Sequence, residues 1–164
     1  SSYCGFLYAG VMVDPNQNIK VLEFNCRFGD PETQPIMMRL KSDLAELCFK
    51  ACKKELSNEE LQWDSRKSLG VVMASGGYPF DYDKGNIIEG ITEELEDLKV
   101  FHAGTIYEEG RIKSNGGRVL CVTALGESVF LAQKKAYDAI SKIKWKDSFY
   151  RNDIGYRAIE REKS

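Results

Sequence analysis

Residues 23–34 read Glu23-Phe24-Asn25-Cys26-Arg27-Phe28-Gly29-Asp30-Pro31-Glu32-Thr33-Gln34, and the rest of the chain is interpreted outward from this stretch. Its first half continues an apolar, aromatic and β-branched pattern that predicts a strand ending at Arg27. Successive side chains of a strand point to opposite faces, so Glu23, Asn25 and Arg27 are expected to share one face. The opposite face is expected to pack into the core and carries Leu22, Phe24, Cys26 and Phe28.

The polar face of this strand has the composition of a site for a metal ion and an anion. The carboxylate of Glu23 and the amide oxygen of Asn25 are hard ligands that Mg²⁺ accepts, and Mg²⁺ completes its shell with water and substrate phosphates. The planar guanidinium of Arg27 suits a phosphate or carboxylate, which it binds with two hydrogen bonds. A solvated strand face is the alternative, but three unlike polar groups on one face favour a site.

The second half of the stretch predicts a turn into a helix. Asp30 is expected to cap this helix, and Pro31 is expected to occupy its first position, where a missing N–H costs nothing. The free N–H groups of a helix N-terminus attract anions. The polar strand face is therefore expected to adjoin an anion-attracting helix start, although capping alone explains Asp30.

Residues 27–34 resemble the signature of the glycinamide ribonucleotide synthetase (phosphoribosylamine–glycine ligase) family of ATP-grasp ligases. Further blocks carry the resemblance along nearly the whole chain, and they are Gly5-Phe6-Leu7-Tyr8-Ala9-Gly10, Gly70-Val71-Val72-Met73-Ala74, Val100-Phe101-His102-Ala103-Gly104-Thr105, Asn115-Gly116-Gly117-Arg118-Val119-Leu120 and Gly155-Tyr156-Arg157-Ala158-Ile159. The resemblance implies that this chain is the later part of such an enzyme. The amino-terminal substrate domain, the ATP-covering lid and the nucleotide-binding lysines are then missing from it.

The resemblance also implies an activity, the ATP-dependent ligation of glycine to 5-phosphoribosylamine through glycyl phosphate in de novo purine biosynthesis. The residues matching Glu23 and Asn25 then hold the catalytic Mg²⁺ or Mn²⁺, with ATP as co-substrate. Arg27 is expected to hold the phosphoryl group, and Asp30 and Glu32 are expected to shape the glycine side. The fragment alone is expected to be inactive. The alternatives are an inactive structural or interaction domain, and another ATP-grasp carboxylate–amine ligase.

The composition is that of an ordinary globular protein. Of the 164 residues, 43% are hydrophobic and 29% are charged, with a formal net charge of −2. This balance gives no electrostatic case for binding nucleic acid or an anionic membrane, and no apolar run approaches the length of a membrane span. The five cysteines are irregularly spaced, which favours reduced thiols packed as small hydrophobes in a cytoplasmic protein.

The predicted fold class is α+β, with two regions. Residues 1–62 are interpreted as the end of an ATP-grasp domain, a hairpin that carries the metal site followed by a helix. Residues 63–164 are interpreted as a carboxy-terminal synthetase domain, a small mixed β-sheet with one packed helix.

Individual elements follow from turn signals and hydrophobic periodicity. A helix is expected at 31–56, with a break near Lys41-Ser42 where Ser42 caps a second segment, and another helix is expected at 128–144. Strands are expected at 4–14, 19–27, 69–75, 86–88, 99–107, 111–114 and 117–125.

The loop Asn115-Gly116-Gly117-Arg118 is a second candidate substrate-binding site. Adjacent glycines can take positive φ and bring backbone N–H groups close to an anion, and Arg118 adds a charged fork. Asn-Gly is also the leading hairpin signal, so the residues alone favour a turn. The family resemblance, in which this domain borders the phosphoribosylamine pocket, makes the two interpretations equal. His102, the only histidine, is interpreted as a structural residue of a strand.

Overall fold

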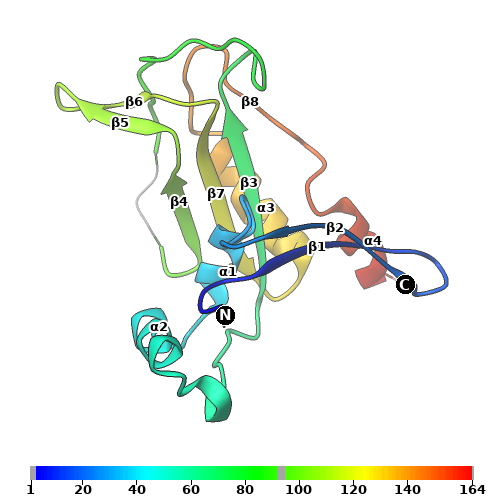
Figure 1. Cartoon of the computed structure of the whole chain (residues 1–164). Coiled ribbons are helices and arrows are strands. Elements are labelled where there is room, and N and C mark those ends of the chain that lie inside the picture. Colours follow the sequence, from blue (N-terminus) through cyan, green and yellow to red (C-terminus); the bar gives the residue numbers. More distant parts are fainter. Residues whose placement is uncertain (1–2, 92–94, 164) are drawn as a thin grey trace. The chain divides into compact units, whose positions relative to one another are not determined.

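The computed structural model describes residues 3–91 and 95–163. The chain forms two compact units, of which the first contains Ser1–Thr33 and Leu40–Trp63 and the second contains Gln34–Arg39 and Asp64–Ser164. Both units combine helices with antiparallel strands (Figure 1), which confirms the α+β fold class. Residues 34–39 belong to the second unit, whereas the sequence-based division placed them in the first region.

A β-hairpin is the framework of the first unit. Its strands β1 (Tyr8–Val13) and β2 (Ile19–Asn25) pair antiparallel. Asp14 closes the turn, because its carboxylate accepts hydrogen bonds from the backbone N–H groups of Asn16 and Asn18, both at 2.9 Å. A bulge shifts the register beside Gly10 and leaves Leu22 without a directly opposite residue.

The apolar face of β2 is not a core face in this unit, which corrects the expectation from the sequence. Leu22 is 64% exposed and Phe24 is 63% exposed, and Cys26 is also exposed. The physical reason is that a sheet of two strands covers neither of its own faces. Phe28 instead stacks on Phe6 beyond the strands, with ring centroids 4.1 Å apart.

The strand and the helices have different limits from those expected. β2 ends at Asn25 rather than Arg27. Helix α1 (Thr33–Arg39) begins at Thr33, so neither Asp30 nor Pro31 lies at its first position.

The expected helix break exists, but Ser42 does not cap the second segment. Helix α2 (Leu44–Lys53) is capped by Asp43, whose carboxylate accepts from the N–H groups of Ala45 and Glu46. The Ser42 hydroxyl instead accepts a hydrogen bond from the backbone N–H of Gln62. A short 3₁₀ turn, η1 (Leu56–Asn58), follows α2.

The second unit is organised on a four-stranded sheet in the order β4–β7–β3–β8. Its strands are β4 (Leu98–His102), β7 (Arg118–Gly126), β3 (Lys67–Ala74) and β8 (Phe149–Tyr150). Every pairing described among them is antiparallel, so the sheet differs from the mixed sheet expected. A separate hairpin contains β5 (Thr105–Glu108) and β6 (Arg111–Ser114).

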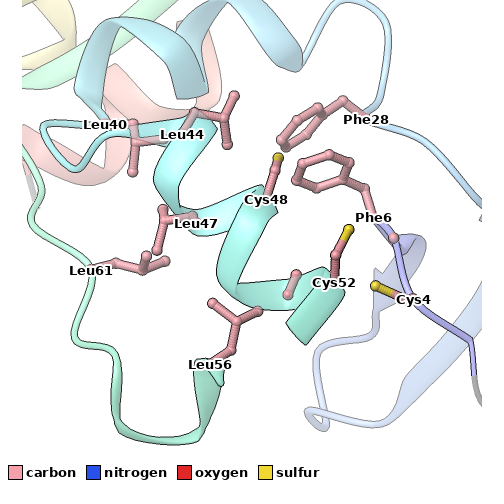
Figure 2. A pocket seen from close by; sticks show the side chains of 12 residues that line it. Cys4, Phe6, Phe28, Leu40, Leu44, Leu47, Cys48, Cys52, Leu56 and Leu61 are labelled. Carbon is pink, nitrogen blue, oxygen red and sulfur yellow. The ribbon is translucent and has the colours of Figure 1, made fainter. Parts of the chain in front are cut away.

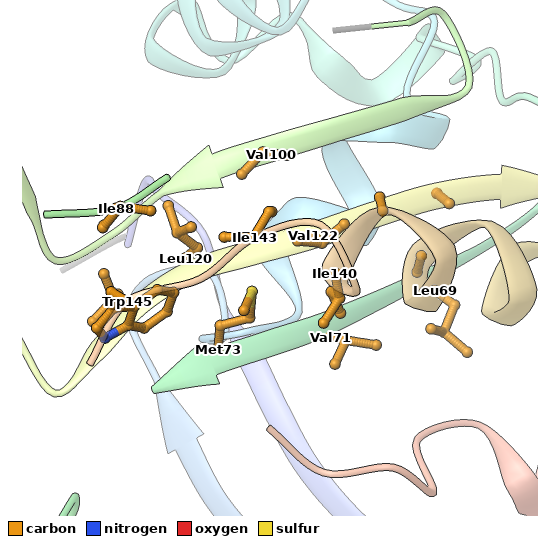
Figure 3. Packing of buried hydrophobic residues seen from close by; sticks show 14 of the residues in the cluster. Leu69, Val71, Met73, Ile88, Val100, Leu120, Val122, Ile140, Ile143 and Trp145 are labelled. Carbon is orange, nitrogen blue, oxygen red and sulfur yellow. The ribbon is translucent and has the colours of Figure 1, made fainter. Parts of the chain in front are cut away.

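Helix α3 (Val129–Ile140) covers one face of this sheet and closes the core (Figure 3). Val71 and Met73 of β3 are fully buried, and Ile140 of α3 is 1% exposed against the same cluster. The helix begins at its cap Ser128, whose hydroxyl accepts from the N–H of Leu131 at 3.2 Å. Helix α4 (Tyr156–Lys163) follows, and its Glu162 carboxylate accepts from the N–H of Val129.

Other expectations in this unit hold only in part. The expected strand at 99–107 is divided into β4 and β5, and residues 86–88 form a single bridge at Ile87 rather than a strand.

Among the residues described, none of the helices has the length and apolarity that crossing a bilayer demands. Cys121 is buried, but Cys4, Cys26 and Cys52 are exposed, so the expectation of packed thiols applies to only some of them.

Candidate functional site

Glu23 and Asn25 lie at alternate positions of β2, beyond the bulge, and so share one face of the strand. On β1, Gly10 is directly opposite Glu23 and Tyr8 is directly opposite Asn25. An ideal Cβ placed on Gly10 would lie 3.1 Å from Cγ of Glu23. Glycine at this position therefore leaves the Glu23 carboxylate room that a side chain would take.

Tyr8 joins this strand face to the turn after β2. Its hydroxyl donates a hydrogen bond to Oε1 of Glu32 at 3.2 Å. The negative charge of Glu32 raises the pKa of Tyr8, and partial burial, the hydrogen bond and the charge of Glu23 act in the same direction. Both carboxylates therefore act on one phenol, so Tyr8, Glu23 and Glu32 form a single polar cluster beside Asn25.

Gly29 allows the turn to approach this cluster. An ideal Cβ on Gly29 would lie 2.9 Å from Cε2 of Tyr8 and would also collide with the Glu32 carboxylate. The Gly29 carbonyl accepts hydrogen bonds from the Thr33 backbone N–H at 3.0 Å and from the Thr33 hydroxyl at 2.6 Å. The start of α1 thereby fixes the turn that carries Glu32.

Strand alternation does not determine on which face Arg27 lies, because the strand is shorter than expected. Arg27 lies beyond the end of β2, where the strand geometry has stopped. Its Nη1 donates to the carbonyl of Phe28 at 2.9 Å, and the side chain is exposed. Asp30 lies in the turn before α1 rather than at the helix cap.

The residues present fit a divalent cation that prefers oxygen. Glu23 offers a carboxylate and Asn25 an amide oxygen on the same face, with the space over Glu23 kept by Gly10. Within residues 3–91 and 95–163, the structure contains no group of three or more His, Cys, Asp or Glu residues that could hold a metal ion. A site with few protein ligands is the type that Mg²⁺ uses, because water and substrate phosphates complete its shell.

An apolar cavity of about 440 Å³ lies elsewhere in the first unit (Figure 2). Side chains of α2, including Leu44, Leu47 and Cys48, line one side, and Phe6 and Phe28 line another. Cys4 lies at this cavity beside Cys52, and the partial loss of water around the exposed Cys4 thiol, together with the neighbouring Cys52 thiol, raises the pKa of Cys4. A raised pKa keeps a larger share of a thiol in its protonated, less nucleophilic form at neutral pH.

The loop Asn115–Arg118 is not a hairpin turn, because it connects strands of two different sheets, β6 and β7. The Asn115 N–H donates to the carbonyl of Gly104 at 2.7 Å. Ser75, at the end of β3 and 1% exposed, donates from its hydroxyl to the Gly116 carbonyl at 3.0 Å and from its N–H to the Gly117 carbonyl at 2.9 Å. These contacts fix the loop from two sides.

The glycines of this loop are required for close packing rather than for positive φ, which corrects the expectation. Gly116 and Gly117 both have negative φ. An ideal Cβ on Gly116 would lie 3.0 Å from Cα of Gly104, and one on Gly117 would overlap the ring of Tyr78. Arg118 follows as the first residue of β7, with an exposed side chain.

The sequence analysis did not identify Tyr8 or Gly10 as residues of the site. It assigned Glu32 to the site without its hydrogen-bond partner Tyr8. The available signal was the hairpin itself, because a two-stranded pairing places some residue of 4–14 opposite each member of the polar face. The missing information was the register, which the bulge at Gly10 determines.

His102, the only histidine of the sequence, is exposed, and its Nδ1 lies 3.0 Å from the hydroxyl of Thr105.

Residues of both units match family models, and the two models describe two domains of the same synthetase. Residues 68–157 match the family described as "Phosphoribosylglycinamide synthetase, C domain". Residues 1–33 match "Phosphoribosylglycinamide synthetase, ATP-grasp (A) domain".

Individual relatives agree with the family matches. The chain is 60% identical over 166 residues to a phosphoribosylamine–glycine ligase of Escherichia coli O157:H7, covering 100% of this chain and 39% of that protein. It is 62% identical over 161 residues to the enzyme of the same name from Haemophilus influenzae, covering 98% of this chain and 38% of that protein. A crystal structure of phosphoribosylamine–glycine ligase from Thermotoga maritima superposes with a TM-score of 0.76 at 32% identity, covering 90% of this chain and 36% of that one. The chain therefore spans well under half the length of these relatives.

Proposed function

The chain belongs to the phosphoribosylglycinamide synthetase family, and from this premise we propose that the protein carrying it joins glycine to 5-phosphoribosylamine at the expense of ATP. The products are glycinamide ribonucleotide, ADP and phosphate, and the reaction belongs to purine biosynthesis. The observation that carries the proposal is that Glu23 and Asn25 share one face of β2, beside the polar cluster that Glu23 forms with Tyr8 and Glu32. The chain is also 60% identical to a protein named phosphoribosylamine–glycine ligase.

We assign the divalent cation, Mg²⁺ or Mn²⁺, to Glu23 and Asn25. Their oxygens suit it, and the absence of a side chain on Gly10 leaves room beside Glu23. When bound, such a cation neutralises charge on the phosphates of ATP. The Tyr8–Glu32 hydrogen bond links the turn that carries Glu32 to β1, which supports a position of the Glu32 carboxylate near the cation.

Arg27 is assigned to the transferring phosphoryl group. Its Nη1 donates to the Phe28 carbonyl, and a guanidinium has five N–H donors in a fixed fork. A cation in this position stabilises charge that develops as phosphate is transferred. Asp30 and Glu32, on the turn before α1, are assigned to the glycine side, where a carboxylate can hold an ammonium group.

The chemistry proposed has two steps. The glycine carboxylate attacks the γ-phosphorus of ATP, ADP departs and glycyl phosphate forms. The amine of 5-phosphoribosylamine then attacks the acyl carbon, phosphate departs with the electron pair of the acyl C–O bond, and the amine loses a proton as the amide forms. Residues of this chain contribute mainly by positioning the groups and stabilising charge. We assign the loop Asn115, Gly116, Gly117 and Arg118 to binding of phosphoribosylamine.

The test uses the full-length enzyme that contains this chain, with release of ADP measured as a function of glycine and phosphoribosylamine. Product of the mass of glycinamide ribonucleotide is expected only when all three substrates are present. Glu23→Gln is expected to lower turnover by at least about 10–100-fold and to raise the Mg²⁺ requirement, since even residues that only support a metal ligand have effects of that size. Glu60→Gln, an exposed carboxylate of the same unit, is the matched control and should change neither.

Two results would redirect the proposal. ADP release that depends on a different carboxylate or amine would indicate another ATP-grasp ligase. An enzyme whose Mg²⁺ dependence is unchanged by Glu23→Gln would place the cation elsewhere. The 164-residue chain alone is expected to release no ADP, and glycine-dependent release from it would contradict the assignment of this chain as an incomplete part of the enzyme.

A further inference from the structure

The turn after β3 places two tyrosines against the Asn115–Arg118 loop. An ideal Cβ on Gly117 would lie 2.9 Å from Cε2 of Tyr78 and 3.1 Å from Cε1 of Tyr82. The two rings are tilted by 57° with centroids 6.3 Å apart. Gly77, with a φ of 90°, permits the turn that presents them, and the Tyr78 N–H donates to the Ser75 carbonyl at 3.1 Å. The glycine at 117 is thus matched to the tyrosine rings.

The hydroxyl groups of these two tyrosines have no protein partner in the part of the chain that the structure describes. Both side chains are half-buried. By contrast, the hydroxyls of Tyr8 and Tyr137 each have a hydrogen-bond acceptor. A tyrosine whose ring is packed and whose hydroxyl is available has the amphipathic character of a ligand-binding residue.

The backbone of the adjacent loop Asn115–Arg118 also has N–H groups without a protein partner in the described part of the chain. The carbonyls of Gly116 and Gly117 both accept from Ser75. Neither glycine N–H has an acceptor among residues 3–91 and 95–163, although Gly117 is buried. Buried N–H groups without an acceptor are rare in native proteins. The ordinary explanation is a partner outside the polypeptide, such as water or a ligand.

We propose that Tyr78 and Tyr82, with the N–H groups of Gly116 and Gly117, bind the 5-phosphate of phosphoribosylamine. All four groups are donors, which is the requirement for an anion that presents several acceptor oxygens. Arg118, next along the chain, adds a positive charge to the same loop. This inference rests on the proposed function and extends it to Tyr78 of the Gly76-Gly77-Tyr78-Pro79 turn and to Tyr82, which follows the turn.

The test compares Tyr78→Phe, Tyr82→Phe and the double variant in the full-length enzyme. Each substitution removes a hydroxyl and retains the ring that packs on Gly117. KM for phosphoribosylamine is expected to rise about tenfold for each single variant, the loss expected for one hydrogen bond to a charged group. KM for ATP and for glycine should not change, and kcat should change little. Tyr107→Phe is the matched control, because Tyr107 is 75% exposed on β5.

A binding measurement separates this inference from the proposed function. Ribose 5-phosphate is expected to bind the wild-type enzyme more tightly than ribose does, and the double variant should lose that difference. An unchanged KM for phosphoribosylamine and unchanged ribose 5-phosphate binding in the double variant would overturn the inference while the ligase activity stands. A Phe variant that fails to fold would also overturn it, because the hydroxyl would then have a structural role. Absence of glycinamide ribonucleotide in the wild type would refute the proposed function, whereas ribose 5-phosphate binding would still test the two tyrosines.

Discussion

The β1–β2 hairpin and the four-stranded sheet differ in what covers them. The sheet has α3 on one face, and Val71, Val119 and Val122 on its strands are fully buried. The hairpin leaves apolar side chains of both faces exposed, with Met12 at 56% on one face and Phe24 at 63% on the other. An alternating apolar pattern therefore identifies a strand in both units, but it does not reveal whether a second layer is present to bury one face.

The largest effect should come from opening the covered face. Ile140→Ala is expected to lower the free energy of unfolding of the second unit by about 2–5 kcal/mol, the range for truncating a buried Ile or Leu. The measurement is denaturant unfolding followed by fluorescence of Trp145, which is 7% exposed in this core, in a Trp63→Phe background. Lys134→Ala, on the solvent side of the same helix, is the control and should stay within about 0.5 kcal/mol. A loss below that limit for Ile140→Ala would mean that α3 does not close the core.

Helix caps should give intermediate effects that also differ between the units. Asp43→Ala is expected to destabilise α2 by about 1 kcal/mol, because its carboxylate accepts from two N–H groups and α2 has no buried residue. Ser128→Ala should cost less, toward the lower end of about 0.5–2 kcal/mol, because Glu162 still accepts from the Val129 N–H. Circular dichroism and amide exchange of the two helices compare them directly. A greater loss for Ser128→Ala would show that α2 is supported by packing rather than by its cap.

The same contrast explains what the sequence could predict. Periodicity located β1, β2, β3, β7 and α3, whereas the caps expected at Asp30 and Ser42 were wrong, because a cap depends on the residue at which the helix begins. The limits of β2, the bulge at Gly10 and the Tyr8–Glu32 contact depend on pairing across the hairpin, which local patterns do not contain.

The loop at 115–118 illustrates a tertiary override. Asn115-Gly116 has the local signal of a hairpin turn, and yet β6 and β7 pair with other strands. Gly116 and Gly117 satisfy steric demands from Gly104 and Tyr78, residues distant in sequence. No local preference for φ indicates a contact of this kind, so only the arrangement of the sheets could reveal it.

A smaller effect is expected on the uncovered face of the hairpin. Phe24→Leu should change the stability of the 164-residue chain by less than about 0.5 kcal/mol, because the ring is 63% exposed. In the full-length enzyme, where we expect further chain to cover this face, the same change should cost up to about 1.5 kcal/mol. The Mg²⁺ dependence of the full-length enzyme should not change, because Phe24 points away from Glu23 and Asn25. An equal and large loss in both would show that the hairpin buries Phe24 without a further layer.

The smallest expected effect concerns the pKa values of two carboxyl groups, one in each unit. Both pKa values are lowered, but the causes differ. Hydrogen bonds from the side chain and backbone of Asn18 lower the pKa of Asp14 in the hairpin turn. A hydrogen bond from the Lys135 ammonium lowers the pKa of Asp97 in the second unit, and its charge acts in the same direction against partial burial. Because each folded-state pKa lies below the unfolded value, each group stabilises the protein above the ordinary carboxyl range of about 4. That contribution is lost as the pH falls through the lowered pKa.

Salt distinguishes the two causes. The Debye length falls from about 10 Å at 0.1 M to about 3 Å at 1 M salt, which weakens attraction between charges more than a hydrogen bond from a neutral amide. NMR titration of the carboxyl carbons should therefore show the pKa of Asp97 rising with salt and that of Asp14 changing less. Lys135→Ala should raise the pKa of Asp97 alone, and Asn18→Ala should raise that of Asp14 alone. If Lys135→Ala leaves Asp97 unchanged while salt raises both values equally, then general screening rather than the Lys135 contact governs Asp97, and the two units do not differ in this respect.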